Sequence, residues 1–187
     1  MPLYRIRIKV AGTPHFVNAM NFFDFEKAKS ISQKYLSAIN SELLMSKHPE
    51  IFEKLKSAFP GQAVEIVDLI KTRVSLIADF ELELKTFVED PARFDMAAVE
   101  KVLSSIDVSA LGVFEENIAV KSVDTIKENI YKVSKEKNLN FGKLMQFLRL
   151  SLVGNLSGPD VFFIIKMIGK NVTLRRVNSL IEKIKKQ

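Results

Sequence analysis

Apolar residues recur at helical spacing along most of this chain. One stripe follows the i, i+3, i+4, i+7 pattern of an amphipathic helix and consists of Ala63, Val64, Ile66, Val67, Ile70, Val74 and Ile77. It predicts a helix over residues 62–80. Weaker versions of the pattern predict helices over residues 24–36, 50–59, 95–106, 109–118 and 123–134. The sequence therefore predicts an all-α protein.

Residues 1–16 depart from this pattern. Residues 3–10 read LYRIRIKV, in which apolar and basic side chains alternate strictly, as they do in a half-buried strand. Because the rest of the chain offers no partner strand, two interpretations of this strand-like segment stay open. It is either the edge remnant of a preceding domain or a sequence foreign to the native protein.

The clearest boundary lies at residues 89–93, which read EDPAR. The proline at position 91 disfavours helical geometry in the residue before it, and acidic residues precede it. We therefore predict two consecutive helical-bundle subdomains, residues 17–90 and residues 91–187.

Near its end the chain has three short amphipathic segments, at residues 141–153, 161–168 and 173–185. Gly154 to Pro159 and Gly169 to Lys170 separate them. Glycine is a common helix stop, and Pro159 with Asp160 suits the first turn of a new helix.

The positive charge is concentrated in this region. The whole chain has a net charge of +6, and the part from Lys143 onward holds nine basic residues against Asp160 and Glu182. That part carries +7, while the remainder carries −1. A basic face on an otherwise balanced body is the expected footprint of a site for a polyanion.

Composition excludes several kinds of chemistry. The chain has no cysteine, which removes thiol catalysis and Cys-ligated zinc, and its histidines, His15 and His48, lie far apart. We expect no metal and no cofactor. No apolar run is long enough to span a membrane, and the amino terminus lacks a signal-peptide layout. These features favour a soluble cytoplasmic protein without a membrane partner.

The basic region resembles the C-terminal anticodon-binding region of bacterial-type glutamyl-tRNA synthetases, which are class I aminoacyl-tRNA synthetases. The matching residues are Lys143, Arg149, Gly154, Ser157-Gly158-Pro159-Asp160, Ile168-Gly169-Lys170 and Thr173-Leu174-Arg175-Arg176. Weaker matches upstream, at residues 23–27, 35–36 and 69–73, extend the likeness from residue 22 to the end. Residues 1–16 lie outside it.

Two departures limit what this resemblance implies. The family usually has Trp and Asn in the helix that begins at residue 24, whereas this chain has no Trp and reads SISQ at residues 30–33. Asn155 stands where the family commonly has Arg. The residues that read individual bases therefore cannot be transferred to named positions here.

The resemblance implies an α-helix-cage fold and a tRNA-binding, anticodon-binding domain of an ATP-dependent glutamate–tRNA ligase. The partners would be the anticodon arm of a glutamate tRNA and the synthetase's catalytic domain, whose strand–helix alternation this chain lacks. We expect no catalysis by the chain alone, and a monomer. The candidate tRNA-binding residues are Lys143, Arg149, Lys166, Lys170, Arg175 and Arg176. The alternative is a helical protein–protein docking module with a basic face.

Overall fold

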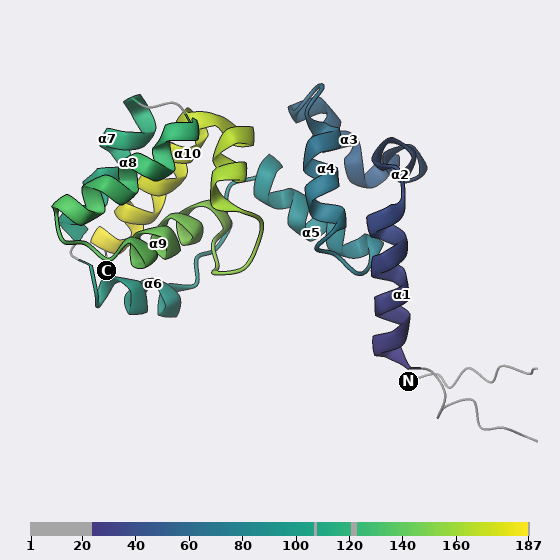
Figure 1. Cartoon of the computed structure of the whole chain (residues 1–187), viewed down its shortest axis with the longest axis horizontal. Helices are drawn as coiled ribbons and strands as arrows, with labels where there is room; N and C mark the ends of the chain where they lie inside the picture. Colours follow the sequence, from purple (N-terminus) through teal and green to yellow (C-terminus); the bar gives the residue numbers. More distant parts are fainter. Residues whose placement is uncertain (1–23, 107, 121–122, 187) are drawn as a thin grey trace, which may run out of the picture.

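The computed structural model describes residues 24–106, 108–120 and 123–186, and these residues are helical with no strand among them (Figure 1). The predicted all-α fold is confirmed. The strand predicted at residues 3–10, like the whole segment 1–16, lies outside the described residues. The elements are α1 (Phe25–Ala38), α2 (Ser41–Lys47), α3 (Pro49–Ala58), α4 (Ala63–Lys71), α5 (Ile77–Val88), α6 (Met96–Leu103), the short 3-10 helix η2 (Val108–Leu111), α7 (Gly112–Val120), α8 (Val123–Glu136), α9 (Phe141–Val153) and α10 (Val161–Lys185).

Several helices begin at an Asp or Asn whose side chain accepts a hydrogen bond from a backbone N–H of the first turn. Asp24, Asn40, Asp95 and Asn140 each accept from the residue three positions later, at 2.9–3.1 Å. Asp160 accepts from two N–H groups at the start of α10. Because the first N–H groups of a helix have no partner within it, these caps set where the helices start.

The helices pack in two groups, which Figure 1 shows side by side. The N-terminal group is α1–α5, in which the buried rings of Phe52 and Phe80 meet edge to face at 5.4 Å. The C-terminal group is α6–α10, in which Phe114 and Phe147 stack at 5.9 Å. The boundary predicted at residue 90 falls in the segment between α5 and α6.

Helices α5 and α10 contact each other at the junction of the groups. Phe87 of α5 is buried there and meets the ring of Phe163 at 6.1 Å. The extended segment from Glu89 to Asp95 connects the groups, and the Asp95 N–H donates to the carbonyl of Gly154 at 2.8 Å. The segment between α9 and α10 therefore packs on the connection between the groups.

One predicted helix is wrong in extent. Residues 62–80 form two helices, because α4 ends at Lys71 and α5 begins at Ile77. The Asp79 carboxylate accepts hydrogen bonds from the N–H groups of Ser75 and Leu76, and so caps a new helix start. Val74 is nevertheless buried, so the apolar stripe continues across a break in the backbone.

The other predicted segments are found with small shifts. The predicted break at Gly169 is a kink inside α10, where this residue has a non-helical φ of 77°. Residues 109–118 are divided between η2 and α7. None of the described helices combines the length and apolarity needed to cross a membrane.

Candidate nucleic-acid interface

The loop of residues 154–160 joins α9 to α10 and carries the most distinctive geometry of the basic region. Gly154 ends α9 with a φ of 86°, and a Cβ placed on it would lie 2.3 Å from the carbonyl oxygen of Arg93. Only glycine fits this close approach in a left-handed conformation. Asn155 accepts a hydrogen bond from the Ser157 N–H at 2.7 Å, which closes a turn inside the loop.

Two arginines from different helix groups meet at this loop. Arg149 of α9 donates from Nη1 to the carbonyls of Gly158 and Pro159 at 3.0 and 2.7 Å. Arg73, which follows α4, donates from Nη2 to the same Gly158 carbonyl at 2.7 Å. Two cations thus converge on one neutral oxygen, although like charges repel at such a distance.

The surroundings of Arg149 leave it cationic but poorly neutralised. Burial lowers the pKa of its guanidinium, Asp160 acts to raise it, and nearby Arg73 lowers it further. Arginine remains charged at neutral pH despite such a shift. Within the described residues its Nε and Nη2 make no hydrogen bond, so donors remain for an anionic or hydrogen-accepting ligand.

A small pocket of about 170 Å³ lies beside Arg149. Met145, Leu156 and Val161 give it apolar walls, and Gln146 adds an amide that can both donate and accept. Its volume is below the roughly 300–1,000 Å³ of sites for drug-sized ligands, so it has room only for a small group.

Arg176 lies in a different environment. Its side chain is 2% exposed and makes hydrogen bonds to Asp90 Oδ1 and to the carbonyls of Thr86, Glu89 and Leu152, at 2.6–3.0 Å. The neighbouring Arg175 is 62% exposed and meets the same Asp90 oxygen at 2.8 Å. The pKa of Asp90 is lowered, mainly by the hydrogen bond from Arg175, against burial, with a further contribution from Arg176.

Comparison with known proteins supplies the family. Residues 33–181 match the family model described as the anticodon binding domain. This chain belongs to the anticodon-binding domain family. The predicted resemblance to the anticodon-binding region of glutamyl-tRNA synthetases is confirmed.

Relatives of this anticodon-binding domain include the glutamate–tRNA ligases of Christiangramia forsetii, 34% identical over 169 residues, and Cytophaga hutchinsonii, 26% identical over 160 residues. These matches cover 87% and 83% of this chain. The chain spans about a third of the length of these curated relatives, 33% and 31% respectively.

Solved structures agree with the sequence matches. The crystal structure of a glutamate tRNA ligase from Elizabethkingia meningosepticum, in complex with its amino acid, superposes with a TM-score of 0.75 at 34% identity. The glutamate-tRNA synthetase of Elizabethkingia anophelis gives 0.73 at 33%. Each match covers 86% of this chain and 32% of the solved one.

The anticodon-binding domain thus distributes its six candidate residues over several environments. Arg149 lies at the loop, while Arg175 and Lys166 lie on the surface; Lys166 pairs with Glu65 of α4 at 2.7 Å. Lys143 and Lys170 are half-buried. Arg176 is interior, and all its hydrogen bonds go to protein groups, unlike those expected of a residue that contacts RNA.

Sequence reasoning assigned Arg73 no role at the loop. Its partner, Gly158, is 85 residues away in sequence, so no local pattern indicated the contact. The available signal was the weak family match at residues 69–73, which ends at Arg73 but does not indicate a contact with the loop.

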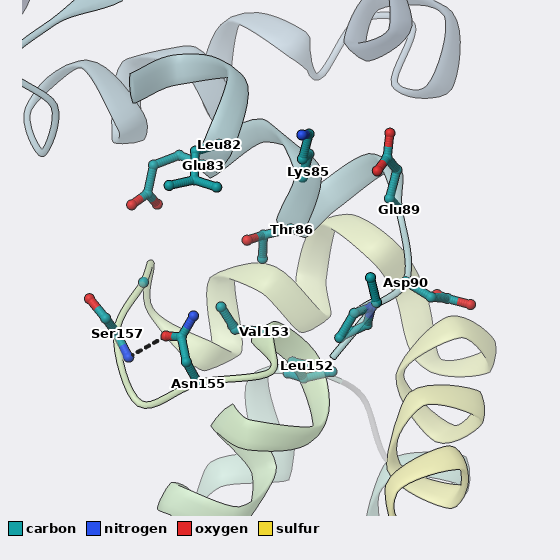
Figure 2. Close-up of a pocket in the computed structure, with 13 residues that line it drawn as sticks. Leu82, Glu83, Lys85, Thr86, Glu89, Asp90, Leu152, Val153, Asn155 and Ser157 are labelled. Carbon is teal, nitrogen blue, oxygen red and sulfur yellow. Dashed lines mark hydrogen bonds between the residues drawn. The ribbon is translucent and has the colours of Figure 1, made fainter. Parts of the chain in front are cut away.

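The domain has a second hollow, of about 320 Å³, between α5 and the 154–160 loop (Figure 2). Glu83, Glu89 and Asp90 line it together with a single cation, Lys85. The Glu83 Oε2 atom is buried without a hydrogen-bond partner in the described part of the chain. This acidic lining is unsuited to phosphate. The described residues include no cluster of acidic or His side chains fit to hold a metal ion.

Proposed function

We propose that this chain binds the anticodon arm of a tRNA and positions it for a synthetase catalytic domain. The observation that carries the proposal is the pocket beside Arg149, where an arginine with donors to spare faces apolar walls and an amide. Proteins read single-stranded RNA by holding unstacked bases against such surfaces and hydrogen-bonding their edges. An anticodon loop presents bases of this kind.

In this proposal the pocket takes one base. Met145, Leu156 and Val161 contact its faces, and Arg149 with Gln146 donates to acceptors on its edge. The exposed or half-buried cations Lys143, Lys166, Lys170 and Arg175 contact phosphates, which gives affinity without sequence choice. Arg73 adds a cation from the N-terminal group, close to the same loop.

Because the relatives are named glutamate–tRNA ligases, we propose a glutamate tRNA as the ligand. The chain spans a third of those proteins, so activation of the amino acid belongs to a separate catalytic domain. We expect no ATP–pyrophosphate exchange by the purified chain, and measurable exchange would overturn this part of the proposal.

We also propose that the chain works as a monomer in the cytoplasm, where translation supplies its ligand. Support for a monomer comes from the burial of most large apolar side chains within the described residues. Light scattering coupled to size-exclusion chromatography measures the mass directly, and a stable dimer at micromolar concentration would contradict the expectation.

The test is a titration of the chain with a labelled glutamate tRNA transcript at several salt concentrations. We expect saturable binding whose affinity falls steeply with salt, as counterion release requires. Arg149→Met, which keeps an apolar stem, should weaken binding about tenfold or more, since one base contact is worth about 1–3 kcal/mol.

Transcripts with altered anticodon bases locate the contact. One base change should lose its effect in Arg149→Met, because the variant no longer reads that position. Arg175→Met is the matched control, expected to weaken all transcripts equally. If the folded protein shows no binding at low salt, the docking-module alternative replaces the proposal. Equal binding of all anticodon variants would reduce it to backbone positioning.

A further inference from the structure

Arg176 binds both helix groups at once. Its Nη1 atom donates to the Thr86 carbonyl of α5 at 2.7 Å and to the Leu152 carbonyl of α9 at 3.0 Å. Its Nη2 and Nε atoms bind the Glu89 carbonyl and the Asp90 carboxylate, at 2.6 and 2.9 Å, in the connection between the groups. One buried side chain on α10 therefore ties the end of α5, the connection and the end of α9 together.

Figure 2 shows how these partners lie. Thr86 lies on the last turn of α5, Glu89 and Asp90 lie just beyond the end of that helix, and Leu152 of α9 lies below them. The open hollow separates the rest of α5 from the 154–160 loop, so the helices are not joined by continuous packing on this side. The other junction contacts include the Phe87–Phe163 ring pair and the exposed Lys166–Glu65 pair.

The geometry of the proposed tRNA site depends on how the two groups are oriented. Arg73 belongs to the N-terminal group and Arg149 to the C-terminal group, yet both donate to the carbonyl of Gly158. A small rotation at the junction would separate these two cations. A site built from two bodies keeps its geometry only where the junction between them is rigid.

We propose that Arg176 is a positioning residue for tRNA binding, which acts by locking the angle between the two helix groups and never touches the RNA. This inference rests on the proposed function, because it concerns the same tRNA site. Arginine suits the role, since its planar fork offers five N–H donors in fixed directions. A lysine at this position could not reach the same four acceptors.

The experiment measures orientation and affinity in the same molecules. The chain has no cysteine, so spin labels can be placed at Glu53→Cys in α3 and Lys132→Cys in α8, both on exposed positions. Pulsed electron–electron double resonance then gives the distribution of distances between the two spin labels, and so between the two helix groups. We expect one narrow distance for the parent, and a broad distribution for Arg176→Met.

Affinity should follow orientation. If only about a tenth of the variant molecules hold the binding orientation, the apparent tRNA affinity falls about tenfold. Arg175→Met is the matched control, because it removes the neighbouring guanidinium and the same Asp90 contact from the surface. It should keep the narrow distance.

Each other outcome has a defined meaning. A narrow distance in Arg176→Met overturns the proposal, whether affinity is kept or lost. If Arg176→Met does not fold, Arg176→Lys replaces it, with the same expected broadening and the same criterion. If the parent fails to bind tRNA, the proposed function fails and this positioning role fails with it, but a broadened Arg176→Met distance would still show the lock.

Discussion

Arg149 and Arg176 both hold a guanidinium against backbone carbonyls at the junction of the two helix groups, but their surroundings differ. Arg149 bonds through Nη1 alone and borders a pocket. Arg176 bonds through all three of its nitrogens and is 2% exposed. The difference shows that a basic residue in a basic region can serve the protein's own geometry, and that the donors of Arg149 which no protein group uses make it the better candidate for a ligand contact.

The largest expected difference between the two arginines is in stability. Arg176→Met leaves the buried Leu152 carbonyl and two partly buried carbonyls without their donor, so we expect a loss of about 3 kcal/mol in unfolding free energy. Arg149→Met should cost less, about 1 kcal/mol, since Arg73 still donates to the Gly158 carbonyl and only the Pro159 carbonyl loses its donor. Urea denaturation monitored by circular dichroism measures the unfolding free energy of both variants.

Arg175→Met provides the control for this comparison. Its ion pair with Asp90 is exposed on both sides, and such pairs are worth about 0–1 kcal/mol. Equal losses for Arg175→Met and Arg176→Met would contradict the distinction between a surface pair and a buried junction.

The stability of the loop should depend most on its first glycine. Gly154→Ala forces a Cβ against the Arg93 carbonyl at 2.3 Å and a side chain into a left-handed backbone, so we expect a loss of about 2–3 kcal/mol. Gly61→Ala has a similar φ of +85° with nothing within 4 Å, and isolates the backbone cost at about 1 kcal/mol. Thermal unfolding of both variants measures the difference. Equal losses of stability would mean that the loop moves away from the Arg93 carbonyl and avoids the clash.

The phase of the last helix explains why the sequence did not separate Arg175 from Arg176. In the segment predicted over residues 173–185, the apolar spacing favours a buried stripe of Leu174, Val177, Ile181 and Ile184. Of these only Val177 is buried in the structure, whereas the buried set is Thr173, Arg176, Val177 and Leu180. That set has the same helical spacing, rotated by about one residue. Because the buried face carries a threonine and an arginine, it is less apolar than the neighbouring face of Leu174, Ile181 and Ile184. Apolar spacing therefore favoured the neighbouring face.

Other features show which information a single sequence carries. Local rules predicted α1, α3 and α9 well, because the apolar spacing lies within each helix. The Arg73–Gly158 and Arg176–Asp90 contacts join residues 85 and 86 positions apart, and nothing local specifies them. The family resemblance is confirmed, but it did not indicate which cations of the basic region point outward.

A smaller effect concerns the shared carbonyl. The effects of Arg73→Met and Arg149→Met on the unfolding free energy should not be additive, because both side chains donate to the Gly158 carbonyl and the charge of Arg73 lowers the pKa of Arg149. Residues within one hydrogen-bond network couple by about 0.5–3 kcal/mol, and we expect the low end because both side chains are partly exposed. A double-mutant cycle in urea measures the coupling. Strict additivity would mean that the two arginines do not act on a common loop geometry.

The smallest effect is on the pH dependence of the junction. The pKa of Asp90 is lowered in the folded protein, first by the hydrogen bond from Arg175 and then, against burial, by that from Arg176. A lowered pKa gives stability that is present above the ordinary carboxyl value and is lost as pH falls through the folded one. The parent should therefore lose stability in acid, below about pH 4, and Asp90→Asn should lose less over that range.

Asp68→Asn is the matched control, because the pKa of Asp68 is lowered inside the N-terminal group, mainly by Lys71. In the parent we expect the distribution of distances between the labels in α3 and α8 to broaden in acid, as Asp90 is protonated. Asp90→Asn should remove this pH dependence, and Asp68→Asn should keep it. Arg149 binds carbonyls, which do not titrate, so its loop should keep its geometry over the same range. An identical acid response in the two Asn variants would show that the carboxylate of Asp90 adds nothing specific to the junction, and that the backbone carbonyls alone hold Arg176 in place.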